Sequence, residues 1–268
     1  FDAFASVEHA LSIVPAGGSV LYFAAGTAGD DSVTIQMVDG AAQYTVNGEA
    51  YDLPAGVSGF GFAGGDGDDR VTVDLAGGPL SGPLSRILFS GGHQTTELGD
   101  GLTIAGTGVE SVDYQPSATT YGDGVIQVDA ATVEFSGLEP VDIISPANAS
   151  LTLPGGDDFV TLTNGFDFLA GGTNQAIRAT GSSGGVAFEA AAFWNLTSLT
   201  INTTAVDGND TITIDSADNG HNIQNLVINT GANSDSLISN GLANFSGSVT
   251  LAVNGLITDG NGGANNFQ

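Results

Sequence analysis

The chain has 268 residues, of which 30 are Asp or Glu, three are Arg and none is Lys, so its net charge is −27. This charge excludes a nucleic acid partner, because phosphate backbones bind cationic side chains, and it disfavours anionic lipid surfaces. It favours cations as ligands and a medium whose salt or calcium screens the self-repulsion. No cysteine is present, which excludes disulfides and thiolate metal sites.

A hydrophobic content of 41 % supports a folded core, and 41 glycines point to many turns. No run of 18 apolar residues occurs, so the sequence predicts no membrane-spanning helix. The chain begins at Phe1 rather than Met, which indicates a processed product or a piece of a longer protein. We expect an exported protein whose secretion signal has been removed or lies outside this sequence.

Residues 1–25 differ from the rest of the chain. Val7, His9, Leu11 and Ile13 alternate, which fits either an extra strand or a short capping helix. We interpret residues 1–25 as an N-terminal extension or cap that could donate a strand to a neighbouring copy.

From Gly26 onward, short segments alternate apolar and polar residues with the period of a β-strand. Each is bounded by Gly, Asp, Asn or Pro, and no convincing amphipathic helix appears. The predicted strands include residues 33–35, 44–46, 71–73, 102–104, 125–128, 133–135, 151–153, 160–162, 199–201, 211–214, 226–228 and 249–251.

One motif recurs, in which glycine and aspartate precede alternating β-branched residues. Its fullest copy, residues 64–72, fits the nonapeptide G-G-x-G-x-D-x-U-x, where U is a large apolar residue. Looser copies are residues 29–35, 155–161 and 207–213, with a faded one at 231–237. Each predicts a sharp turn that leads into a strand, because glycine permits positive φ and Asp or Asn side chains bond the turn backbone.

The spacing of the strands indicates how they stack. Leu199 and Leu226 lie 27 residues apart, Leu226 and Val249 lie 23 apart, and Ile212 and Leu237 lie 25 apart. Recurrence of two strands per unit is typical of a parallel β-helix, whose short strands stack in register.

We therefore predict an all-β fold, a right-handed parallel β-helix of roughly nine or ten coils over residues 26–268. One β-sandwich or two small ones is the alternative, because sandwiches also use many short strands.

The Gly/Asp turns are candidate calcium sites. If Asp210 and Asp235 occupy equivalent corners of adjacent coils, their carboxylates repel, and calcium bound through carboxylate and carbonyl oxygens would relieve the repulsion. The candidate ligands are Asp66, Asp68, Asp69, Asp30, Asp31, Asp157, Asp158, Asp207 and Asp210. The competing interpretation is that these side chains only cap solvent-facing turns.

Paired carboxylates also allow a polysaccharide hydrolase with a β-helix fold, with Asp68/Asp69 or Asp157/Asp158 as the catalytic pair. An anionic polysaccharide needs cationic guides, however, and the chain has only three Arg. We expect Arg70 to pair with a neighbouring Asp.

The three histidines, His9, His93 and His221, form no ligand spacing and are interpreted as ordinary loop or surface residues. No hydrolase or phosphate-binding motif occurs. We therefore do not expect an enzyme.

Several motifs resemble those of very large secreted bacterial surface proteins. Residues 199–214 look like their LTINTG-x-GNDTI-x-I units, residues 135–141 resemble another of their phrases, and residues 64–72 are similar to the calcium-binding RTX nonapeptide. The chain departs from RTX proteins because only one copy is complete and the copies are not in tandem. The resemblance implies an extracellular repeat protein, associated with calcium and used for adhesion or matrix building.

Together these features predict an extracellular structural protein, a segment of a fibre or matrix that joins head to tail or continues in a longer chain. A carbohydrate-binding or cell-adhesion module is the second hypothesis. Five glycosylation sequons occur, at Asn148, Asn195, Asn202, Asn209 and Asn244.

Overall fold

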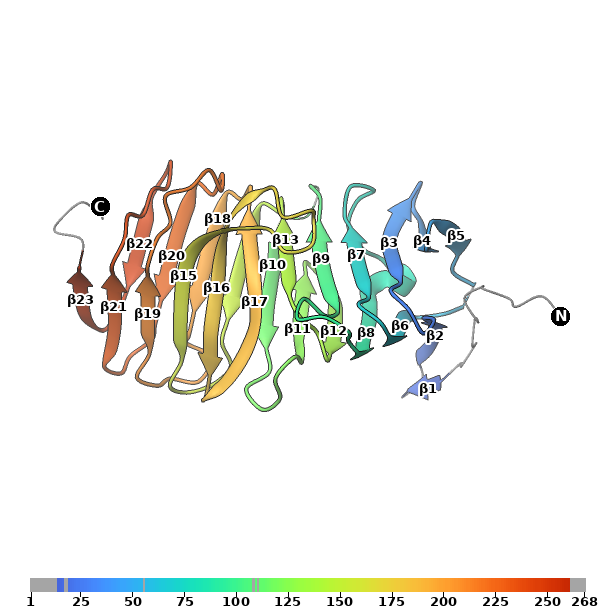
Figure 1. Ribbon diagram of the computed structural model, residues 1–268, viewed down its shortest axis with the longest axis horizontal. Helices are drawn as coiled ribbons and strands as arrows, with labels where there is room; N and C mark the ends of the chain where they lie inside the picture. Colours follow the sequence, from blue (N-terminus) through green and yellow to red (C-terminus); the bar gives the residue numbers. More distant parts are fainter. Residues whose placement is uncertain (1–13, 17–18, 55, 108, 110, 261–268) are drawn as a thin grey trace.

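The computed structural model describes residues 14–16, 19–54, 56–107, 109 and 111–260. Within these ranges strands dominate, and the helical structure is a single 3-10 turn, η1 (Gly82–Ser85). No helix in these ranges is long and apolar enough to cross a bilayer. The strands form two large sheets that extend along the long axis of the molecule (Figure 1). The predicted all-β class is confirmed.

Eleven strands of the described chain form the first sheet, sheet A. In spatial order they are β1 (Val14–Ala16), β2 (Ser19–Ala25), β6 (Gly59–Asp66), β8 (Arg86–His93), β12 (Ala131–Ser136), β11 (Gly124–Val128), β10 (Ser111–Pro116), β14 (Asn148–Thr152), β18 (Ser198–Asn202), β20 (Asn225–Asn229) and β22 (Val249–Ala252).

Twelve strands of the described chain form the second, sheet B. In spatial order they are β23 (Gly255–Asp259), β21 (Asp235–Ser239), β19 (Thr211–Ile214), β15 (Phe159–Phe166), β16 (Gln175–Ser183), β17 (Val186–Trp194), β13 (Val141–Ile144), β9 (Gly101–Ala105), β7 (Arg70–Asp74), β3 (Ser32–Val38), β4 (Ala41–Val46) and β5 (Glu49–Asp52).

The chain passes repeatedly from a strand of sheet A directly to a strand of sheet B. We call each such pair a rung, its connecting segment the acidic corner, and the segment that leads back to sheet A the return corner. The rungs are β2/β3, β6/β7, β8/β9, β12/β13, β14/β15, β18/β19, β20/β21 and β22/β23. Strands of successive rungs pair in parallel, for example β18 with β20 and β19 with β21.

The register of these pairs agrees with the spacing of the sequence. Leu199 pairs with Leu226, Leu226 pairs with Val249, and Ile212 pairs with Leu237. Side chains that alternate inward therefore lie above one another from rung to rung, and apolar residues form a continuous core between the sheets.

Two antiparallel insertions interrupt the parallel stacking, a third antiparallel meander, β3–β4–β5, ends sheet B, and the sequence analysis predicted none of them. Strands β10, β11 and β12 form a meander within sheet A, and β15, β16 and β17 form another within sheet B. In each insertion the middle strand runs antiparallel, so the outer two remain parallel to their neighbours in the sheet. Tight turns make this possible, and Gly184 and Gly185 both adopt positive φ between β16 and β17.

At one end of the stack, β2 pairs in parallel with β6, while β1 and β5 lie at the sheet edges (Figure 1). The strand or helix predicted around residues 7–14 lies outside the described residues, except for Val14, which opens β1.

Five phenylalanines on the strands are buried in the core: Phe60, Phe62, Phe89, Phe135 and Phe188. Trp194 is buried in a separate small cluster with Ala176 and Ala192. His221 lies in the loop between β19 and β20, within the interpretation as a loop or surface residue, but its ring is buried against Phe245. Its Nδ1 accepts the N–H of Ile223, and burial lowers its pKa, so the ring is neutral.

Candidate functional site

Buried carboxylates form a column inside the acidic corner. Asp31, Asp69 and Asp100 each directly precede the sheet-B strand of their rung, and all three are buried. The backbone N–H of Asp31 donates to Oδ1 of Asp69 (2.8 Å), and the N–H of Asp69 donates to Oδ1 of Asp100 (2.7 Å). Each carboxylate thus satisfies the amide of the preceding rung, which explains why aspartate recurs at this place in the motif.

The same arrangement recurs in the C-terminal half. The N–H of Asp158 donates to Oδ1 of Asp210 (2.9 Å), and the N–H of Asp210 donates to Oδ1 of Asp235 (3.1 Å). The prediction that Asp210 and Asp235 occupy equivalent corners of adjacent repeats is confirmed. Here threonines complete the site, because Thr203 and Thr230 donate to Oδ2 of Asp210 (2.5 Å) and Asp235 (2.6 Å).

Two glutamates continue the column between these halves, and sequence reasoning missed both. Leu102 pairs with Val141, and Val141 pairs with Ala191. Asp100, Glu139 and Glu189 each lie two residues before one of these paired residues, so the register aligns the three carboxylates. Neither glutamate belongs to a Gly/Asp motif, so only the register reveals them. We call Asp31, Asp69, Asp100, Glu139, Glu189, Asp158, Asp210 and Asp235 the inner column.

Five members of the inner column have a buried oxygen without a hydrogen-bond partner among the described residues. These atoms are Oδ2 of Asp69, Asp100 and Asp158, Oε2 of Glu139 and Oε1 of Glu189. A buried carboxylate oxygen that lacks a donor or a cation strongly disfavours the ionised form.

The pKa values of the inner column reflect this environment. Burial is the main cause that raises the pKa of Asp69 to about 7, and repulsion from Asp100 adds to it. The N–H bond from Asp31 acts in the opposite direction and lowers this pKa. Burial likewise raises the pKa of Glu189 to about 7 and that of Asp158 to about 6. Burial is also the main reason why the pKa values of Asp100, Glu139 and Asp210 are raised.

The arginines of the chain do not neutralise the inner column through direct ion pairs. Arg70 donates to the carbonyls of Asp69 (2.9 Å) and Gly99, so the expected pairing with a carboxylate is wrong, although its charge lowers the pKa of Asp100. Arg86 pairs with Glu134 on sheet A (3.0 Å). Arg178 stacks on Phe168 and donates to the carbonyl of Phe166. Neutralisation therefore has to come from protons or from cations outside the chain.

A second, outer set of carboxylates faces solvent along the same corner. Asp30 accepts the N–H of Asp68 (2.8 Å), Asp157 accepts that of Asn209 (2.8 Å), and Asp207 accepts that of Ala232 (2.8 Å).

Within this outer set, Asp68 is the most strongly bonded carboxylate. It receives both the hydroxyl and the N–H of Thr95 and of Thr96, and these bonds, led by the Thr96 hydroxyl, lower its pKa to about 2. Asp66 is exposed at the end of β6.

The structure therefore separates the predicted metal ligands into two groups. Asp31, Asp69, Asp158 and Asp210 are in the inner column. The other predicted ligands, Asp66, Asp68, Asp30, Asp157 and Asp207, lie toward solvent. In the described ranges no three His, Asp or Glu side chains converge as a ready-made metal centre. A cation would have to combine carboxylates of successive rungs with carbonyl oxygens and water.

Glycine is required where a carboxylate of the inner column enters the corner. A Cβ on Gly64 would lie 1.9 Å from Oδ2 of Asp69 and 2.7 Å from the carbonyl oxygen of Gly91. A Cβ on Gly91 would lie 2.4 Å from Oδ2 of Asp100. Gly64 and Gly91 thus leave the space that the buried carboxylates occupy.

Another buried carboxylate, Asp142 on β13, was not predicted from the sequence. It accepts the N–H groups of Phe168 (3.0 Å), Leu169 (2.7 Å) and Ala170 (3.4 Å), which belong to the loop between β15 and β16. Burial raises its pKa to about 6 against these three bonds. Its contacts explain it fully as an anchor for this loop.

The five sequon asparagines are not equally accessible. Asn148, Asn195, Asn209 and Asn244 are exposed, whereas Asn202 is half-buried and accepts the hydroxyl of Thr204. Asn195 also lines a groove at the return corner.

Comparison with known protein families, with curated proteins and with solved structures finds no match to this chain. The functional argument therefore rests on the residues themselves.

Proposed function

We propose that this chain is an extracellular structural protein, a segment of a surface fibre or matrix, stabilised by calcium along its acidic corner. The observation that carries the proposal is the inner column. Its carboxylates, most of them buried, lie at the acidic corners of successive rungs and, for Glu189, on the meander strand β17, and none of these described residues makes an ion pair with an arginine. Outside a cell, calcium is the abundant divalent cation that binds such oxygen ligands. The net charge of −27 adds a general attraction for cations.

For the architecture behind this role, we infer a right-handed parallel β-helix. The alternation of rungs between two sheets and the parallel pairing of successive rungs support it. Connections between parallel strands of one sheet are right-handed in nearly all proteins, which supports the hand. A β-sandwich would share the two facing sheets but would join its strands in antiparallel pairs.

We propose that the partner of this chain is a further copy of itself, joined end to end. At the last described rung, Leu256 and Ile257 are 64 % and 47 % exposed, whereas Leu237 on the preceding rung is fully buried. A second copy stacked on this rung, or a further rung of a longer chain, would bury these side chains and pair the edges of β22 and β23, beyond which the described residues place no other strand. The resemblance to secreted bacterial repeat proteins implies adhesion or matrix building, which an end-to-end assembly would serve.

The hypothesis of a polysaccharide hydrolase is less well supported than the structural role. In each predicted catalytic pair, one carboxylate (Asp69 or Asp158) is buried inside the corner, where a polysaccharide has no access. The partner in the first pair, Asp68, holds a lowered pKa and is occupied by donors from Thr95 and Thr96, which disfavours it as a general acid.

A thermal melt at pH 8 with calcium or with a chelator tests the proposal. Calcium at about 100 times its dissociation constant should add about 2.7 kcal/mol to the unfolding free energy. Asp100→Asn should reduce this gain, whereas Asp52→Asn, on the exposed edge strand β5, should retain it in full. Equal melting temperatures with calcium and with chelator in the unsubstituted chain would remove calcium from the proposal.

A further inference from the structure

A groove runs across successive return corners, at the edge of the stack opposite the acidic corner. Ser145, Asn195 and Asn222 occupy equivalent positions in these corners, since Asn148 pairs with Ser198, which pairs with Asn225. All three adopt the left-handed conformation, with φ of 66°, 58° and 53°. The same backbone turn is thus repeated, and it presents equivalent side chains at the spacing of neighbouring strands.

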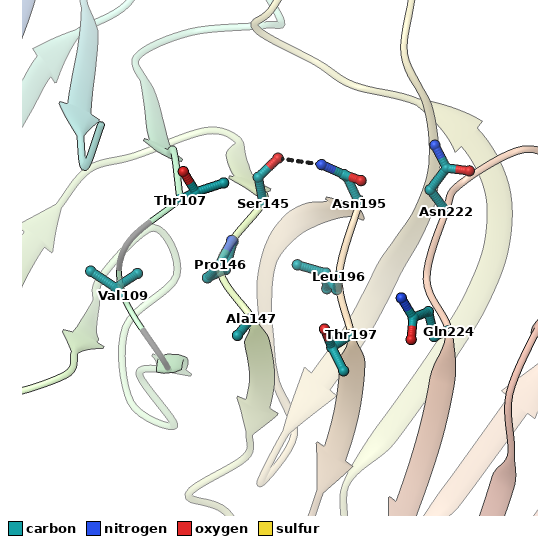
Figure 2. A pocket seen from close by; sticks show the side chains of 10 residues that line it. All are labelled: Thr107, Val109, Ser145, Pro146, Ala147, Asn195, Leu196, Thr197, Asn222 and Gln224. Carbon is teal, nitrogen blue, oxygen red and sulfur yellow. Dashed lines mark hydrogen bonds between the residues drawn. The ribbon is translucent and has the colours of Figure 1, made fainter. Parts of the chain in front are cut away.

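The groove encloses about 290 Å³ and has an apolar floor between two polar rows. Figure 2 shows Thr107, Ser145, Asn195 and Asn222 along one side, and Thr197 and Gln224 along the other. Val109, Pro146 and Leu196 lie between these rows.

The polar side chains of the groove retain most of their hydrogen-bonding capacity. Asn195 donates to the hydroxyl of Ser145 (2.7 Å), as the dashed line in Figure 2 marks. The side chains of Thr197, Asn222 and Gln224 have no hydrogen-bond partner among the described residues, and Asn222 and Gln224 are exposed.

The backbone beside these side chains, by contrast, is already paired between rungs. The N–H of Leu196 donates to the backbone carbonyl of Asn222 (3.1 Å), and the N–H of Gln224 donates to the backbone carbonyl of Leu196 (3.0 Å). The free donors and acceptors of the groove are therefore on its side chains.

The groove is also free of charge. None of its lining residues is Asp, Glu, Arg, Lys or His, although the chain as a whole carries a net charge of −27. Amides and hydroxyls both donate and accept, so they match a ligand that does the same. The aliphatic side chains between the rows are almost fully buried, so they offer such a ligand only a small apolar contact.

We propose that this groove binds an uncharged oligosaccharide that lies across the rungs. A neutral sugar ring combines hydroxyls around its edge with C–H groups on its face, which is the complement of two polar rows and an aliphatic floor. Because the side-chain positions repeat from rung to rung, successive sugar units would meet similar contacts. This site is independent of the carboxylates at the opposite corner, so it adds glycan attachment to the structural role proposed above.

The test is isothermal titration of the whole chain with neutral hexasaccharides of glucose, mannose, galactose and xylose, and with oligogalacturonate as the acidic counterpart. At least one neutral hexasaccharide should bind, and the double variant Thr197→Ala, Gln224→Ala should weaken binding about tenfold or more through the loss of two hydrogen bonds. These side chains have no described internal bond, so the variant should keep the circular dichroism spectrum and melting temperature of the parent chain. Asn233→Ala, an exposed asparagine on the acidic corner, is the matched control and should bind as the parent does.

Three results would overturn the proposal: no neutral hexasaccharide binds at millimolar concentration, the acidic oligosaccharide binds better than the neutral ones, or the double variant binds as well as the parent. The titrations are done both with calcium and with chelator. Failure of the calcium role would leave binding at this groove unchanged, so the two proposals fail separately.

Discussion

Replacing Asp69 by Asn should stabilise the protein at alkaline pH when calcium is absent. Asparagine keeps an Oδ1 that accepts the N–H of Asp31, the bond that spans 2.8 Å in the structure. It removes the negative charge whose second oxygen, Oδ2, is buried without a partner among the described residues. The substitution therefore preserves the geometry of the corner and removes the electrostatic cost.

The magnitude follows from the pKa of Asp69. A rise from 3.8 to about 7 corresponds to about 4 kcal/mol between the protonated and ionised forms. Because the raised pKa belongs to the folded state, this stability is fully present below pH 3.8 and is lost as the pH rises through about 7. With relaxation around the ionised group, we expect Asp69→Asn to gain about 2–4 kcal/mol at pH 8, and close to nothing at pH 4.

The assay is thermal unfolding monitored by circular dichroism in chelator at pH 4 and pH 8. For a chain of this length the gain at pH 8 corresponds to a rise of about 4–8 °C in melting temperature. Asp52→Asn, which removes an exposed charge on β5, is the control and should change the melting temperature little at either pH. A melting temperature for Asp69→Asn that is lower than that of the parent at pH 8 in chelator would refute the reasoning. It would mean that the ionised carboxylate is already well solvated or paired.

Three further predictions concern the same corner. Gly64→Ala should cost at least about 2 kcal/mol because its Cβ meets the Asp69 carboxylate at 1.9 Å, whereas Gly29→Ala, with nothing within 4 Å, should be near neutral in urea unfolding. Thr203→Val removes the donor to Oδ2 of Asp210 and should lower the unfolding free energy by about 1–3 kcal/mol. Thr200→Val, at an outward-facing position, should lower it little. Equal effects of the two substitutions would contradict this role for the Thr203 hydroxyl. In chelator the unsubstituted protein should melt at a higher temperature at pH 5 than at pH 8, since burial raises the pKa of most inner carboxyls; the opposite order would contradict their burial.

The sequence predicted the parts of the fold that depend on local repetition. The Gly/Asp motif marked the turns at residues 64–72 and 207–213, and the spacing of Leu199, Leu226 and Val249 gave the correct pairing. Both signals come from residues that repeat because each rung places them in the same environment. The presence of an aspartate at each of these corners could therefore be predicted from the sequence alone.

The parts that depend on non-local pairing were missed. The meanders β10–β12 and β15–β17 alter the order of the strands in space, although each strand has the same alternation as a parallel one. Hairpin turns such as Gly184-Gly185 were the available signal for these reversals. Glu139 and Glu189 come together only through the register of β13 and β17, so no local motif could have joined them.

Carboxyl 13C chemical shifts, followed through a pH titration with and without calcium, test the central claim most directly. The claim is that the inner column is largely buried, makes no ion pair with an arginine of the described chain and is neutralised by protons or calcium. In chelator the carboxyl of Asp69 should titrate near pH 7, and saturating calcium should lower that midpoint by more than about one unit. A carboxyl that titrates near pH 4 under both conditions would contradict the claim.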